Sequence, residues 1–116
     1  MLNERQLAFL SIARACAAVK CKSKFKLNET DLSVVYEVAK AEPDGMFFGE
    51  LCDLMQERDK TVVFRSIQRM REAGVLAASM KYNPENKREG NCYTLGPNAA
   101  SQINFWADIF DSSINL

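Results

Sequence analysis

Apolar residues recur along the chain with two different periods, and the pattern predicts helices joined to one β-hairpin. Spacings of three and four positions, which are typical of helices, fill five segments: 3–19, 29–41, 48–55, 60–74 and about 98–111. Shorter apolar runs typical of strands are "MFF" (46–48), "VLAASMKY" (75–82) and "NCYTL" (91–95). The predicted fold class is therefore mainly α with a small β-hairpin (α+β).

Residues that favour helix ends mark most of these boundaries. Side chains able to accept hydrogen bonds from first-turn N–H groups precede three of the helices, at Asn3, Asn28 and Asp59. Asp31 adds a carboxylate to the first turn of the second helix. Pro43 and the turn Asp44-Gly45 end that helix, and Gly74 ends the fourth one.

The fourth predicted helix has one apolar and one polar side. The residues expected to be buried are Val63, Ser66, Ile67 and Met70. The opposite side presents Lys60, Thr61, Phe64, Arg65 and Gln68. A short helix (48–55), a polar turn (56–59) and this helix form the pattern of a helix-turn-helix, and the hairpin that follows makes it the winged form.

Composition narrows the class of protein. The 116 residues suit one domain, and 47% hydrophobic and 26% charged residues are ordinary for a globular protein. No apolar run is long enough to span a membrane, and no secretory leader is visible. We therefore expect a cytoplasmic protein without a membrane partner, associated with the nucleoid only through DNA.

The net charge of zero conceals blocks of opposite sign. Residues 1–26 carry six basic and one acidic side chain, and residues 27–59 carry two basic and nine acidic ones. Residues 60–90 carry seven basic and three acidic side chains, and residues 91–116 add two acidic ones. Because the block 60–90 coincides with the fourth helix and the hairpin, the sequence predicts a basic face there.

Cysteine and histidine usage argues against a metal site and against catalysis. The four cysteines form no C-x-x-C pair, and histidine is absent, so no metal ligand set is expected. Buried, inert thiols in a reducing compartment are the default, and oxidant sensing by Cys16 is the alternative. Without a Gly-rich phosphate loop or paired carboxylates in an apolar setting, no catalytic residue, no cofactor and no enzyme activity are predicted.

The basic helix and hairpin predict double-stranded DNA as the partner, because such a helix enters the major groove with its N-terminal side chains leading. Arg65 suits a guanine and Gln68 an adenine. Thr61 and Val62 suit thymine methyl groups, while Lys60 and the hairpin cations suit phosphates or the minor groove. The predicted DNA-binding residues are Lys60, Thr61, Val62, Phe64, Arg65, Gln68, Arg69, Lys81, Lys87 and Arg88.

Residues 27–100 resemble the winged-helix core of MarR-family transcriptional regulators. The most specific parts are "DKTVVFRSIQRMREAGVL" (59–76) and the "NPENKR" wing (83–88) leading into "LGP" (95–97). That family's wing usually reads Asp-x-Arg and then Leu-Thr-Pro. Here Asn86-Lys87-Arg88 and Leu95-Gly96-Pro97 stand at those places, so the resemblance gives Arg88 the role of the wing arginine. It implies a dimeric, DNA-binding regulator, most simply a repressor.

The terminal helices are the predicted dimer interface, because both are apolar on more than one side. The residues assigned to it are Leu7, Leu10, Ile103, Trp106, Ile109 and Phe110. The expected organisation is one winged-helix domain spanning 1–116. It comprises a dimerisation helix and basic linker (1–26), a winged-helix core (27–97) and a second dimerisation helix (98–116).

Other interpretations stay open at this point. The arginines of the fourth helix also fit an ordinary solvated surface. The winged helix also fits a protein-interaction module, with Phe64 and the acidic block 27–59 as its surface, and the protein partner is then unknown. A DNA-binding accessory of plasmid or phage partition or replication is a close variant of the main hypothesis.

Overall fold

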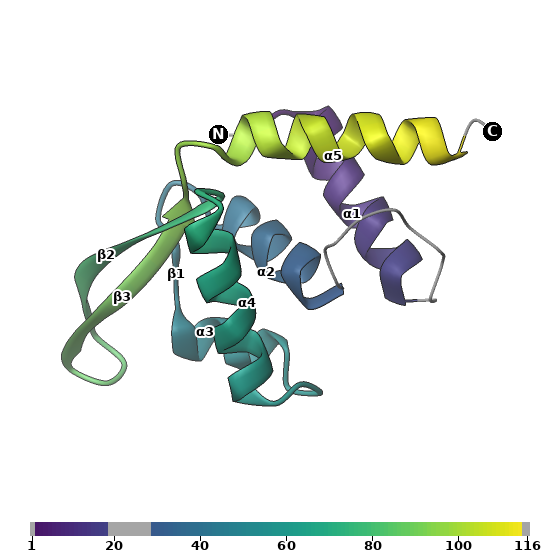
Figure 1. Cartoon of the computed structure of the whole chain (residues 1–116). Coiled ribbons are helices and arrows are strands. Elements are labelled where there is room, and N and C mark those ends of the chain that lie inside the picture. The colour runs from purple at the N-terminus through teal and green to yellow at the C-terminus, as the bar shows by residue number, and fades with distance from the viewer. Residues whose placement is uncertain (1, 19–28, 115–116) are drawn as a thin grey trace.

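The computed structural model describes residues 2–18 and 29–114, which form five helices and one three-stranded sheet (Figure 1). The elements are α1 (Glu4–Ala18), α2 (Glu29–Lys40), β1 (Met46–Phe47), α3 (Phe48–Leu54), α4 (Lys60–Glu72), β2 (Leu76–Asn83), β3 (Arg88–Leu95) and α5 (Ala99–Ile114). Every predicted helix and strand is present, which confirms the α+β class with a small hairpin.

The helices share one core, and the hairpin projects from it. Helix α2 packs against both α1 and α4, and α5 crosses α1 at the end of the molecule far from the hairpin tip (Figure 1). The molecule is accordingly elongated, measuring 52 × 28 × 22 Å. The fully buried core side chains come from every layer: Leu10, Leu32, Val34, Val35, Val38, Leu51, Val63, Ile67, Val75 and Ile103.

Two of the predicted helix starts are confirmed by their hydrogen bonds. The backbone N–H of Asn3 donates to Gln6 Oε1 (2.8 Å), and Asn3 Oδ1 accepts from the backbone N–H of Gln6 (2.9 Å), a reciprocal cap at the start of α1. Asp59 Oδ1 accepts from the backbone N–H of Thr61 (2.8 Å) at the start of α4. The predicted cap at Asn28 and the basic linker lie outside the described residues.

The end of α4 is closed as its glycine predicts. Gly74 adopts φ +76°, and its N–H donates to the Arg71 carbonyl (3.0 Å), while the N–H of Val75 donates to the Met70 carbonyl (2.9 Å). A Cβ at Gly74 would lie 2.4 Å from Asn98 Nδ2, so only glycine fits both the backbone and the space. This sharp stop directs the chain straight into β2.

The sheet is antiparallel in the order β1-β3-β2, and its hairpin is longer than predicted. Strand β3 begins at Arg88 instead of position 91, and Arg88 pairs with Asn83. The physical reason lies in the connection, because Asn83 Oδ1 accepts from the Glu85 N–H (3.0 Å) and Asn86 Oδ1 from the Arg88 N–H (3.1 Å). These two local turns leave only residues 84–87 between the strands.

Helix α5 also departs from the prediction, since it continues to Ile114 and passes the expected end near 111. Among residues 2–18 and 29–114, no helix combines the length and the apolar character needed to cross a bilayer.

Candidate nucleic-acid interface

Helix α4 separates its apolar and polar side chains as the sequence predicted. Val63, Ser66, Ile67 and Met70 are buried against the core. The side chains of the opposite face are exposed, and they are Lys60, Thr61, Val62, Phe64, Arg65, Gln68 and Arg69. Because the only acidic residue of the helix, Glu72, stands in its last turn, the leading half of the exposed face has no carboxylate of its own.

Asp59 caps the N-terminal end of α4. The backbone N–H of Thr61 donates to its carboxylate, and this bond holds the pKa of Asp59 below its ordinary value of 3.8. Arg58 forms an ion pair with Glu29 on α2, which fixes the turn between α3 and α4 to the helix behind it. The turn is therefore fixed to α2, and the first residues of α4, which follow it, are exposed to solvent.

Arg69 has a partner inside the protein. Its Nη2 donates to Asp31 Oδ1 (2.7 Å), and Ser66 Oγ donates to the same oxygen (2.5 Å). Asp31 is 2% exposed, whereas the Arg69 side chain is 46% exposed. The pair ties α4 to α2, so Arg69 fixes the position of α4 whatever else its exposed atoms contact.

Phe64 contacts protein, although nearly half of it faces solvent. Its ring meets that of Phe48 on α3 edge to face, with centroids 5.9 Å apart and planes at 89°. It remains 45% exposed. The sequence left open whether this ring faces DNA or protein, and the structure gives it a partner within its own chain.

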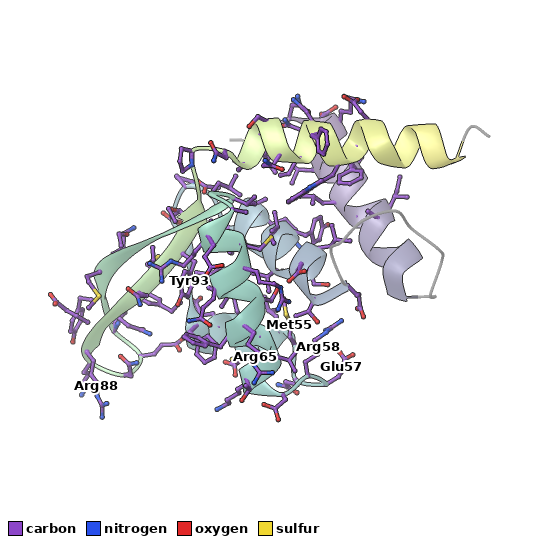
Figure 2. The ribbon with its side chains drawn as sticks, viewed as in Figure 1. Met55, Glu57, Arg58, Arg65, Arg88 and Tyr93 are labelled. Atoms are coloured by element: carbon purple, nitrogen blue, oxygen red, sulfur yellow. The ribbon has the colours of Figure 1, made fainter. Side chains whose placement is uncertain are left out.

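The tip of the wing carries two cations. Lys87 lies in the connection and adopts φ 56°, the left-handed region, and Arg88 opens β3. Arg88 and Arg65 lie at the same end of the molecule, opposite α5 (Figure 2). Lys81 lies two residues before the end of β2, and its Nζ donates to the Asp44 carbonyl (3.4 Å).

The chain resembles solved structures in fold while differing from them in sequence. No protein-family model and no curated protein matches it. A mutant MarR from E. coli has a TM-score of 0.56 at 13% identity, over 99% of this chain and 81% of that one. S. aureus MepR bound to ethidium bromide has a TM-score of 0.52 at 11% identity, over 99% and 79%. A possible transcriptional regulator from Methanosarcina mazei Go1 has a TM-score of 0.51 at 20% identity, over 90% and 80%.

The chain has a MarR-like winged-helix fold. In this winged helix, α3 and α4 are the two helices of the helix-turn-helix, and β2 and β3 form the wing. The helix-turn-helix and the wing therefore lie where the sequence located them.

The terminal helices of the winged helix already use much of their apolar surface within one chain. Leu10 and Ile103 are fully buried, Trp106 is 9% exposed and Leu7 is partly buried against the core. The side chains of Ile109 and Phe110 lie outside the described residues. Among the described side chains of α1 and α5, the large apolar ones that are exposed are Ile12 and Phe105, at 53% and 60%. Pairing of these helices with a second copy stays a prediction.

The described cysteines are buried, as expected for inert thiols. Cys52 and Cys92 are free, and burial raises the pKa of both thiols above the ordinary value of 9.0. The Cys16 side chain lies outside the described residues. Within the described part of the chain, no three histidine, cysteine or carboxylate side chains come together as a metal site.

Sequence reasoning missed two features of the winged helix. It gave Asp31 only a place in a first turn, although this carboxylate is the buried acceptor for Ser66 and Arg69. It also missed an acidic, aromatic cleft between α3, α4 and the wing, because that cleft joins residues that are far apart in the chain. The signal for the buried role of Asp31 was its unusual presence within an otherwise apolar helix stripe.

Proposed function

We propose that the chain is a sequence-specific, double-stranded DNA-binding transcriptional regulator that acts as a dimer. The observation that carries this proposal is the exposed face of α4, where Lys60, Arg65 and Gln68 face solvent and the helix has no acidic residue before Glu72. The two cations of the wing tip lie at the same end of the molecule as Arg65 (Figure 2). The similar solved structure from Methanosarcina mazei Go1 is named as a possible transcriptional regulator, which supports the proposal.

The proposed mechanism places α4 in the major groove. Arg65 forks onto the O6 and N7 acceptors of a guanine, and Gln68 pairs with an adenine. Thr61 and Val62 meet thymine methyl groups or, for Thr61, a phosphate, while Lys60 fixes the helix on the backbone. Arg69, held by Asp31, keeps α4 at its angle to α2 and reaches DNA only with the exposed part of its guanidinium.

The wing supplies contacts that do not depend on sequence. Lys87 and Arg88 reach the phosphates or the adjacent minor groove beside the site of α4. Lys81 adds charge from β2. These contacts raise affinity for all duplexes alike, so the proposed specificity resides in α4.

A dimer built through residues 1–26 and 98–116 would place two such cores, residues 27–97, on one operator. Two recognition helices related by a two-fold axis read half-sites about 34 Å apart on a pseudo-palindrome. Occupying a promoter in this way represses transcription without any further chemistry.

The test is selection of a preferred site from a random duplex pool, followed by fluorescence anisotropy with that site. Arg65→Ala should weaken binding by about 1–3 kcal/mol and relax the preference at one base pair. Arg5→Ala, which removes the same charge from α1, should leave both unchanged. Selection of no site, or equal losses for the two variants, would refute the proposal.

A further inference from the structure

A cleft of about 680 Å³ opens between α3, the middle of α4 and the β3 side of the wing. Four aromatic residues and three carboxylates line it: Phe47, Phe48, Phe64 and Tyr93, with Glu50, Asp53 and Glu85. Of these side chains only Phe64 belongs to the predicted DNA-binding set. Its volume falls within the range of ligand-binding clefts, so the composition of its walls decides what fits.

One wall of the cleft is an open strand edge. Strand β1 pairs only with Cys92 and Tyr93 and then ends at Phe47, whereas β3 continues back to Arg88. The N–H of Leu95 donates to Glu42 Oε1 (2.8 Å), on the side of β3 that faces away from β2. Because backbone groups alternate along a strand, those of Asn91 and Glu89 point to this side too.

This edge is available for pairing. Asn91 and Gly90 line the cleft, and β1 turns into α3 before it could cover them. The residues from Arg88 to Asn91 thus offer about 13 Å of strand edge that β1 does not cover, enough for a short extended segment. An extended peptide commonly adds to a sheet edge of this kind through main-chain hydrogen bonds.

The charge of the cleft lining determines whether a basic or an acidic segment can bind there. Its lining contains three carboxylates and neither lysine nor arginine. Glu50 is held in place, since its Oε1 accepts from the Phe47 N–H (3.0 Å). A nucleic acid backbone is repelled by such walls, whereas a basic peptide is attracted to them.

The aromatic rings add a second reason for cations. Phe48 and Phe64 meet edge to face, and Phe64 keeps nearly half of its surface open beside the carboxylates. An arginine or lysine side chain laid on an aromatic face gains a cation–π contact along with its ion pair. The lining therefore matches a cationic side chain better than an apolar one.

We propose that this cleft binds an extended, basic segment of a partner protein, which adds to the open edge of β3. Its backbone pairs with Asn91 and Glu89, and its cations lie between Asp53, Glu85 and the ring of Phe64. This interaction surface borders the proposed DNA contacts, since Phe64 lies on the exposed face of α4 and Glu85 lies in the wing connection beside Lys87.

The test uses the full chain and a fluorescein-labelled peptide of alternating arginine and valine, followed by anisotropy without DNA. Saturable binding is expected for this peptide and none for its glutamate–valine counterpart. N-methylation of the backbone on one edge of the peptide should abolish binding, whereas N-methylation on the opposite edge should preserve it. Equal binding of the two N-methylated peptides would overturn strand addition.

Charge reversal on the protein locates the site. The double variant Asp53→Lys with Glu85→Lys should weaken peptide binding by about tenfold or more. Two exposed carboxylates outside the cleft, changed together as Glu57→Lys with Glu72→Lys, provide a control of equal net charge and should weaken binding much less. Equal losses in the two double variants would show attraction by overall charge and would overturn the assignment. Because the peptide assay contains no DNA, a failure to bind the peptide would not contradict the proposed DNA binding. A failure to bind DNA would likewise not contradict peptide binding in the cleft.

Discussion

At the scale of single residues, Asp31 has the clearest structural role in the molecule. A carboxylate that is 2% exposed needs strong partners, and Ser66 and Arg69 provide them from α4. The sequence placed Ser66 correctly on the buried stripe of α4. It did not connect either residue with Asp31, because contacts across 35 and 38 positions leave no periodic signal.

Removing the charge of Asp31 should therefore destabilise the fold. Asp31→Asn keeps the shape of the side chain but removes its negative charge. Ser66 and Arg69 then donate to a neutral amide oxygen, so we expect the free energy of unfolding to fall by about 1.5–3 kcal/mol. Glu37→Gln, on the same helix, removes the charge that pairs with exposed Lys40 and should cost less than Asp31→Asn. Urea denaturation measures both, and equal stability of the two variants would contradict this role.

Asp59 predicts a pH dependence of stability. Its pKa is lower in the folded protein than the ordinary 3.8, because the Thr61 N–H favours the ionised form. Such a carboxylate stabilises the fold above its unfolded-state pKa, and the contribution is lost as the pH falls through the folded value. Asp59→Asn keeps an acceptor without this titration, so its urea midpoint should fall less than that of the wild type between about pH 5 and pH 2. Parallel pH profiles would exclude the cap as the cause.

At the scale of elements, the local signals of the sequence located almost every helix and strand. Capping residues, Gly74 and helical periodicity act over a few positions, and the boundaries of α4 agree with them. The wing shows where such reasoning stops. Polar residues from Arg88 to Gly90 looked like a turn, but pairing with β2 makes them a strand, because a ladder tolerates polar side chains at an exposed edge.

The wing connection supplies a prediction in which stability and binding change in opposite directions. Lys87 has a left-handed φ of 56°, which glycine adopts without steric strain, so Lys87→Gly should raise the free energy of unfolding by about 0.5–1 kcal/mol. Removal of the positive charge should weaken binding to every duplex. Lys81→Gly makes the same change within β2 and should lower stability by about 0.5–1 kcal/mol. Urea denaturation and duplex anisotropy test the pair, and a stability loss in Lys87→Gly would refute the strain.

At the scale of the whole molecule, the helix-turn-helix and wing could be predicted because they occupy consecutive segments. The packing of α5 across α1 could not, since the two helices are at opposite ends of the chain (Figure 1). Hydrophobic periodicity shows that Leu10 and Ile103 pack against another apolar surface. It does not show whether that surface belongs to the same chain or to a second copy. The structure buries both within one chain, so a dimer seam would use what remains exposed on these helices.

The proposed dimer can be tested on that exposed surface. We expect light scattering after size-exclusion chromatography to give twice the mass of one chain. Ile12→Glu together with Phe105→Glu should give the monomer, because two charges would then enter an apolar seam. Met80→Glu, an equally exposed apolar position on the wing, is the control and should remain dimeric. A monomeric wild type would refute the seam.

The measurement that tests the central claim most directly is the salt dependence of binding to a duplex, followed by fluorescence anisotropy. Binding by α4 and the wing through about six phosphate contacts per dimer gives a slope near −5 for log affinity against log salt concentration. Arg88→Ala, which removes one contact from each wing, should make that slope shallower by about 2. Absence of binding at low salt, or a slope unaffected by the loss of Arg88, would contradict DNA recognition by this winged helix.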